Sequence, residues 1–169
     1  MNPRVSIIMG STSDLPVMEK AAKVLEEWEI PFEMCALSAH RTPLQVEEFA
    51  KNAKERGVEV IISAAGMAAA LPGVIAANTI LPVIGVPIKG PVLDGVDALL
   101  SIVQMPPGIP VATVAINGAM NAAMLAIQIM ANADKLLADR LVLYKESLKD
   151  KIVKANAELS NVGYKFKVN

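Results

Sequence analysis

The stretch Val5-Ser-Ile-Ile-Met9-Gly10-Ser-Thr-Ser-Asp14 contains the first clue to the fold. Val5–Met9 is a short apolar run that ends at a glycine, which is typical of a buried β-strand. Directly after it, Pro16 suits the first turn of a helix over Leu15–Trp28. A strand followed at once by a helix begins an α/β alternation, and the rest of the chain continues it.

Apolar runs and helical patterns keep alternating along the chain. Further strands are predicted at Phe32–Leu37, Val58–Ile62, Pro82–Val86 and Val111–Ala115. Helices are predicted from Pro43 (after a capping-box pattern at Thr42) to Gly57, through Ile75–Ala77, and over Gly118–Met130 and Asp134–Leu159. Continuously apolar strands indicate a parallel sheet that helices cover on both faces. We therefore expect one α/β domain over residues 1–169: a three-layer α/β/α sandwich, flavodoxin-like, with five parallel strands and a long C-terminal helix.

The middle of the chain is unusually poor in charge. Between Val60 and Ala133 the charged residues are Lys89, Asp94 and Asp97. A membrane-spanning helix needs about 20 apolar residues, but prolines and glycines interrupt this stretch too often. We therefore expect a soluble protein that does not span a membrane and has more apolar surface than one small core requires, which indicates a homo-oligomer. The helix over residues 134–160 is predicted to pack on a neighbouring subunit through its apolar face.

Charge and composition exclude several classes of protein. The net charge of −1 argues against a nucleic-acid-binding protein. One cysteine, Cys35, excludes a disulfide scaffold, and as part of a strand it reads as a small buried side chain. One histidine, His40, excludes a histidine-rich metal site. The segment MNPRVSIIMG lacks the pattern of a cleavable signal, so a cytoplasmic location is expected.

Loops that follow parallel strands meet at one edge of the sheet, where ligands bind. The first such loop contains Gly10, Ser11, Ser13 and Asp14. Its glycine permits close approach, and its hydroxyls and the following helix N-terminus suit a phosphate, while Asp14 suits ribose hydroxyls. The alternative is an ordinary capping loop in which Ser13 or Asp14 caps the helix.

The second loop, Ser38-Ala39-His40-Arg41-Thr42-Pro43, holds the only histidine beside an arginine. Arginine binds phosphate in a bidentate manner. Histidine is the side chain whose ordinary pKa lies near neutrality, which suits proton transfer. The alternative, a surface histidine without function, is less favoured because of the loop's position.

The third loop, predicted over Ser63–Gly73, has almost no side-chain chemistry. Its small residues permit a flat ligand or a small gas-like molecule to approach the backbone. They equally permit tight helix packing, and the residues themselves do not choose between the two.

Taken together, the loops resemble one family, class I 5-(carboxyamino)imidazole ribonucleotide mutase. The resemblance covers residues 4–160 and rests on five segments: MGSTSDLPVM (Met9–Met18), SAHRTP (Ser38–Pro43), LPGVIAANT (Leu71–Thr79), LPVIGVP (Leu81–Pro87) and DALLSIVQMPPGIPVATVAIN (Asp97–Asn117). SAHRTP combined with SIVQMP is the most specific part.

The resemblance implies an isomerase of purine biosynthesis that moves a carboxyl group from the exocyclic nitrogen to ring carbon four. It also implies a homo-octamer with sites at subunit contacts, and neither a metal nor an organic cofactor. His40 would shuttle the proton, and Ser11, Asp14 and Arg41 would bind the ribose-phosphate. The complete set implied to bind the substrate is Gly10, Ser11, Ser13, Asp14, Ser38, Ala39, Arg41, Gly66, Met67, Ala68 and Leu71.

The third loop departs from the family pattern, which usually reads GAGGAAHLPG. Here Met67 replaces one glycine and Ala70 replaces the second histidine. This departure leaves open how the carboxyl group is held. Two alternatives remain: a class II carboxylase that uses carbon dioxide directly, which usually has lysine where Arg41 stands, and a non-catalytic nucleotide-binding paralogue.

Overall fold

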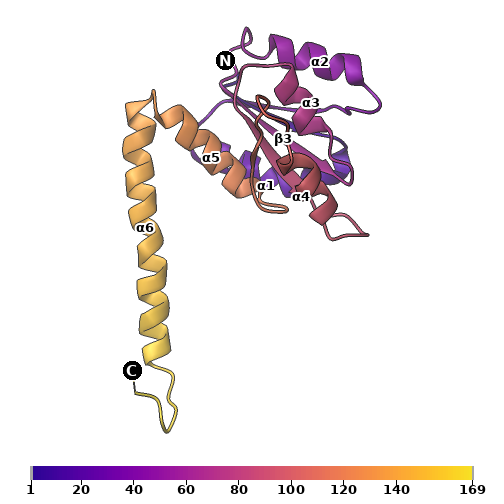
Figure 1. Ribbon diagram of the computed structural model, residues 1–169. Coiled ribbons are helices and arrows are strands. Elements are labelled where there is room, and N and C mark those ends of the chain that lie inside the picture. The colour runs from indigo at the N-terminus through magenta and orange to yellow at the C-terminus, as the bar shows by residue number, and fades with distance from the viewer. Residues whose placement is uncertain (1, 169) are drawn as a thin grey trace. The chain divides into compact units, whose positions relative to one another are not determined.

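The computed structural model describes residues 2–168, which divide between Met130 and Ala131 into two compact units. The first unit is an α/β structure around a five-stranded parallel sheet with the strand order β2-β1-β3-β4-β5 (Figure 1). The strands are β1 (Val5–Met9), β2 (Phe32–Ala36), β3 (Val60–Gly66), β4 (Val83–Ile88) and β5 (Ala112–Thr113). The predicted parallel α/β class is confirmed.

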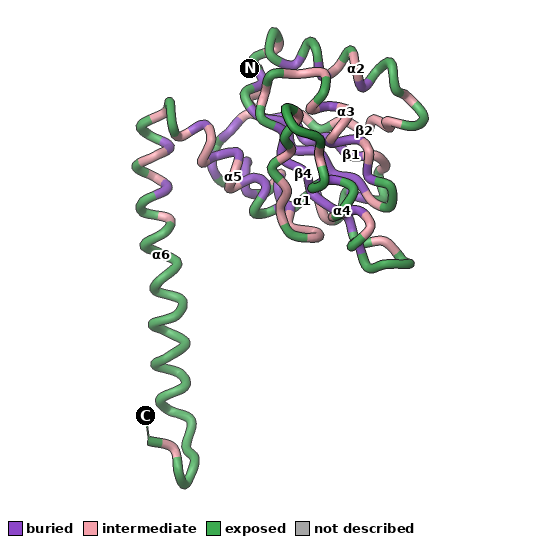
Figure 2. Tube along the Cα trace, viewed as in Figure 1, coloured by how far each residue is buried: buried purple, intermediate pink, exposed green. Residues whose placement is uncertain are grey.

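Helices cover both faces of this sheet. They are α1 (Leu15–Glu27), α2 (Pro43–Asn52), α3 (Leu71–Ala77), α4 (Val96–Val103) and α5 (Ala119–Ala131). On one face, α2, α3 and α4 pack on Ile8, Ile61 and Ala65. The alternate strand residues, such as Ile7 and Ile62, are fully buried on the opposite face, which α1 and α5 cover. Figure 2 shows the buried residues concentrated in this sheet.

The central strands are mostly apolar because both of their faces are covered. All five residues of β1 and all six of β4 are buried. Close packing explains the glycine at position 85 in β4, since a Cβ there would lie 2.4 Å from Ile102 Cγ2 of α4. The edge strand β2 is only partly buried, and β5 is reduced to two residues.

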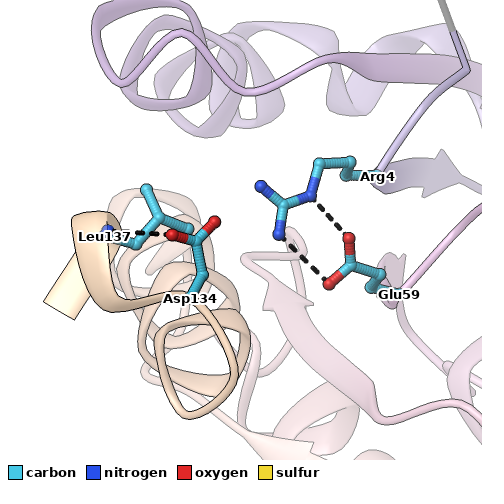
Figure 3. Close-up of polar contacts among 4 residues, drawn as sticks. All are labelled: Arg4, Glu59, Asp134 and Leu137. Atoms are coloured by element: carbon cyan, nitrogen blue, oxygen red, sulfur yellow. Dashed lines mark hydrogen bonds and ion pairs between the residues drawn. The ribbon is translucent and has the colours of Figure 1, made fainter.

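An ion pair joins the starts of two neighbouring strands, at the end of the sheet away from the predicted loops (Figure 3). Arg4 Nε donates to Glu59 Oε1 at 2.5 Å and Arg4 Nη2 donates to Glu59 Oε2 at 3.2 Å. The backbone amide of Glu59 also donates to the Arg4 carbonyl at 2.8 Å. These contacts hold β1 and β3 in the register that pairs Val5 with Val60.

Several predicted boundaries were wrong. β3 runs to Gly66, so the first four residues of the predicted third loop, Ser63–Gly66, belong to a strand. The helix α4 was not predicted at all. The helix α5 is buried along one side, which includes Ala122, Ala126 and Met130, whereas Met120 is 52% exposed.

The second unit consists mainly of α6 (Lys135–Ser160), which agrees with the predicted C-terminal helix. Asp134 caps it, because its carboxylate accepts a hydrogen bond from the Leu137 amide at 3.2 Å (Figure 3). Leu137 and Leu141 are buried, whereas Ile152 and Leu159, from the same predicted apolar face, are exposed. Figure 2 shows that most of α6 is exposed. Within residues 2–168, no helix is both long and apolar enough to cross a membrane.

Candidate active site

A cavity of about 510 Å³ lies at the carboxyl ends of β1, β2 and β3, where the three predicted loops meet. Its lining residues are Gly10, Ser11, Ser13, Asp14, Ser38, Ala39, His40, Arg41, Ala65, Gly66, Met67, Ala69, Ala70 and Leu71. The structure therefore brings together every residue predicted for the site except Ala68, which lies in the third loop but does not line the cavity. Ala65, Ala69 and Ala70 line it in addition.

The first loop begins with a short 3₁₀ turn that the Ser11 side chain caps. Ser11 Oγ accepts a hydrogen bond from the Ser13 amide at 3.3 Å, at the start of a 3₁₀ turn over Thr12–Asp14. Asp14 precedes α1, but its side chain makes no capping hydrogen bond. The alternative interpretation, in which Ser13 or Asp14 caps the helix, is therefore wrong, and Asp14 lines the cavity.

Asp14 is a buried carboxylate, with 9% of its surface exposed. This burial raises the pKa of Asp14 above its ordinary value, because the charged form is poorly solvated there. Hydrogen bonds from the Ser13 hydroxyl, at 3.3 Å, and from the backbone near Ser11 oppose this rise in the pKa. The Asp14 carboxylate lines the cavity in spite of this cost of burying its charge, so it can accept hydrogen bonds from the hydroxyl groups of a ligand.

Gly10 leaves space in the cavity wall. A Cβ built on Gly10 would meet no atom within 4 Å, so the fold does not require glycine there for packing. The same residue lines the cavity, and its carbonyl faces the second loop. The missing side chain therefore leaves the backbone open to close approach by a ligand.

Arg41 joins the first loop to the second. Its Nη2 donates to the Gly10 carbonyl at 3.0 Å and its Nε donates to Ser38 Oγ at 3.4 Å. Ser38 Oγ also accepts from the Arg41 amide at 3.2 Å. These contacts hold the guanidinium at the cavity, where its further N–H groups can bind an anion such as a phosphate.

The turn that carries His40 is held by Ser38 and Thr42. The Thr42 hydroxyl accepts from the Ser38 amide at 2.9 Å and donates to the Ser38 carbonyl at 3.1 Å. Thr42 precedes α2, yet its side chain makes no capping bond to that helix, so the predicted capping box is absent. Thr42 instead braces the turn over Ala39–Arg41, and this exposes His40 at the cavity.

The third loop contributes backbone and small side chains. Met67 has φ +53° and Ala69 has φ +36°, although neither is glycine. The Ala69 amide donates to the Gly66 carbonyl at 3.0 Å, which closes a tight turn. This side of the cavity therefore has no charged side chain, in contrast to the first two loops.

Other reactive groups lie outside this cavity. Cys35 is half-buried in β2, and burial, followed by the nearby charge of Glu33, raises the pKa of its thiol. The thiol thus stays protonated near neutrality. Among residues 2–168, no group of three His, Cys, Asp or Glu side chains could hold a metal ion.

The architecture and the cavity define an α/β protein with a candidate ligand site at the carboxyl edge of a parallel sheet. The family model for AIR carboxylase matches residues 4–151. The chain therefore belongs to the AIR carboxylase family.

Relatives span nearly the whole chain. The N5-carboxyaminoimidazole ribonucleotide mutase of Thermotoga maritima is 54% identical and covers 99% of this chain and 98% of its own length. The Pyrococcus abyssi protein of the same name is 60% identical over 87% of this chain and 84% of its own. The crystal structure of Treponema denticola PurE is similar with a TM-score of 0.83, at 33% identity, over 93% of this chain and 98% of that one.

Proposed function

We propose that this chain is an N5-carboxyaminoimidazole ribonucleotide mutase of purine biosynthesis. The observation that carries the proposal is the meeting of His40, Arg41 and Asp14 at a cavity whose third side is small and apolar. Two relatives with this activity in their names, at 54% and 60% identity, support it.

The polar side of the cavity suits the ribose-phosphate of such a substrate. Arg41 supplies N–H groups for the phosphate, and Asp14 accepts hydrogen bonds from ribose hydroxyls. Gly10, Ser11 and Ser13 line the space between them. The imidazole then lies toward Ser38, Ala39 and the third loop, with its exocyclic nitrogen near His40.

The reaction divides into two steps with one proton carrier. The bond between the exocyclic nitrogen and the carboxyl carbon breaks, carbon dioxide forms, and His40 gives a proton to the nitrogen. Ring carbon four of aminoimidazole ribonucleotide then attacks carbon dioxide, and His40 takes up the proton that this carbon loses. Keeping both fragments in one cavity makes the second step effectively intramolecular.

A single assay separates this function from its alternatives. The purified chain is given the carboxyamino substrate in one arm, and aminoimidazole ribonucleotide with bicarbonate in the other. Faster formation of the 4-carboxy product in the first arm supports the mutase, and faster formation in the second arm indicates a class II carboxylase. Tight binding of aminoimidazole ribonucleotide without product in either arm indicates a non-catalytic paralogue.

The homo-octamer and a contact between the C-terminal helix and a neighbouring subunit are part of the same proposal. The second unit exposes large apolar side chains along α6, among them Leu136, Leu143 and Ile152, which supports a protein partner. Light scattering at micromolar concentration tests this, and a uniform monomer would contradict it.

A cytoplasmic location is also proposed, because a phosphorylated substrate does not cross a lipid bilayer unaided, and cell fractionation tests it.

A further inference from the structure

The third loop keeps a methionine in a backbone conformation that favours glycine. Met67 has φ +53°, and it is the second residue of the turn that the hydrogen bond from the Ala69 amide to the Gly66 carbonyl closes. A positive φ at this turn position is normally supplied by glycine, because a side chain there is strained. Strain kept at the wall of a cavity suggests that the side chain itself has a use.

The Met67 side chain lies at the mouth of the cavity. It is among the lining residues, yet 66% of it is exposed to solvent. Its neighbours in the wall, Ala65, Gly66 and Ala69, have almost no side chain, and Leu71 is buried. Met67 is therefore the large apolar group of this wall that can reach both the cavity and its opening, and its thioether is flexible enough to cover a small ligand.

The proposed reaction creates a need for such a group. Carbon dioxide carries no charge, so Arg41 cannot hold it as it holds a phosphate. Its retention depends instead on apolar closure of the cavity until carbon four attacks it.

We propose that the Met67 side chain closes the apolar side of the cavity and retains carbon dioxide between the two half-reactions. This proposal rests on the proposed mutase function and assigns Met67 as a positioning residue. No proton moves through it: His40 carries the proton in both steps, and Met67 acts by limiting the escape of carbon dioxide.

The test follows the fate of the carboxyl carbon. The carboxyamino substrate is turned over in ¹³C-bicarbonate with carbonic anhydrase present, and mass spectrometry measures label in the 4-carboxy product and the aminoimidazole ribonucleotide released. Wild type should form product with little label. Met67→Ala should raise label and release by roughly tenfold, the scale expected when a small apolar group is removed from a pocket. A reaction without enzyme corrects for spontaneous loss of carbon dioxide.

Two further variants separate the side chain from the backbone. Met67→Leu restores apolar bulk and should return label to the wild-type level. Met67→Gly removes both the side chain and the backbone strain, so it should raise the label in the product and the release of aminoimidazole ribonucleotide as Met67→Ala does. Met120→Ala, at an exposed methionine on α5, is the matched control and should not change label.

The outcomes distinguish this proposal from the function on which it rests. If wild type forms no 4-carboxy product, the mutase function and this role fall together. If wild type forms product but label is already complete, free carbon dioxide is used as in a class II carboxylase, and the role of Met67 falls together with the mutase function. If wild type forms product with little label and Met67→Ala and Met67→Gly retain the carbon equally well, the mutase function stands and the role of Met67 is overturned.

Discussion

The two sides of the cavity are built on opposite principles. The first and second loops contribute Asp14, His40 and Arg41. The Asp14 carboxylate accepts a hydrogen bond from the Ser13 hydroxyl, and the Arg41 guanidinium donates to Ser38 Oγ and to the Gly10 carbonyl. The segment Gly66–Leu71, from the last residue of β3 to the first residue of α3, contributes an uncharged wall whose shape comes from positive φ angles at Met67 and Ala69. The side with Asp14, His40 and Arg41 can bind a charged group and transfer protons, whereas the uncharged side can only match the shape of a ligand.

This difference predicts how the two sides respond to substitution. A polar side chain that meets the substrate acts through a few strong interactions, so its loss changes rate or affinity by large factors. A wall of small residues acts through fit, so its changes alter stability and retention by smaller amounts. The predictions below test this contrast, first on the polar side.

His40→Asn should have the largest effect. Asparagine can keep a hydrogen bond but cannot transfer a proton near neutrality, and general acid–base catalysis typically contributes about 10²- to 10⁴-fold. We expect kcat to fall by that amount while the variant still folds and binds aminoimidazole ribonucleotide. Steady-state kinetics with calorimetric titration of the nucleotide measures both, and turnover near the wild-type rate would remove His40 from the mechanism.

Arg41→Ala should mainly weaken binding. Hydrogen bonds to charged groups contribute about 1.5–3 kcal/mol, which corresponds to roughly a ten- to hundredfold loss of affinity. Arg41→Lys keeps the charge but not the planar guanidinium, so we expect an intermediate affinity. Titration with a nucleotide that has the phosphate and one that lacks it should show the loss only for the first. An equal loss for both would mean that Arg41 does not contact the phosphate.

The polar side was largely predictable from sequence, because its residues lie in short motifs directly after strands. Gly10–Asp14 follows β1 and Ser38–Arg41 follows β2, and parallel strands bring such loops to one edge. The local hydrogen bonds were harder to predict. Thr42 stabilises the turn before it instead of capping α2, since its hydroxyl forms hydrogen bonds with the backbone amide and carbonyl of Ser38.

The apolar side and its surroundings were less predictable, because uniformly small or apolar residues carry no periodic signal. Ser63–Gly66 continue β3, although their composition suggested a loop. The helix α4 was missed because Leu100 and Val103 are exposed while Ala98 and Ile102 are buried, so apolar residues occur on both of its sides. The left-handed angles at Met67 and Ala69 could not be read from residues that disfavour them.

Asp14→Asn should stabilise the protein at neutral pH. Burial raises the pKa of Asp14 in the folded state, so between the ordinary value of about 3.9 and that raised pKa the folded protein binds more protons than the unfolded one. Stability from this group therefore falls as pH rises through that window, and the loss persists at neutral pH. The neutral amide avoids this loss, so the stability difference between variant and wild type should shrink toward acid pH.

Urea unfolding measures this difference in the free energy of unfolding. Both proteins are unfolded at neutral pH and again at the most acidic pH at which both are still folded. The same variant should bind a ribonucleotide more weakly than wild type, since an amide is a poorer acceptor for two hydroxyls. A variant that is less stable than wild type at neutral pH would contradict the account of Asp14 as a carboxylate buried at a cost.

On the apolar side, substitutions at Met67 should give the smallest effect, and its sign is unusual. A left-handed backbone costs a residue with a side chain about 1–2 kcal/mol relative to glycine, partly offset by the greater freedom of glycine in the unfolded chain. Met67→Gly should therefore be more stable than Met67→Ala by about 1 kcal/mol, which shifts the melting temperature by roughly 2–4 °C in a chain of this size.

The matched pair at Glu48, an exposed position inside α2, should give the opposite sign. There Glu48→Gly should be less stable than Glu48→Ala by about 1 kcal/mol, because glycine is a poor helix former. Thermal melts of the four variants compare the two pairs directly. If alanine is the more stable residue at both positions, Met67 is not strained, and the apolar wall owes its shape to packing rather than to a left-handed turn held against the preference of its side chain.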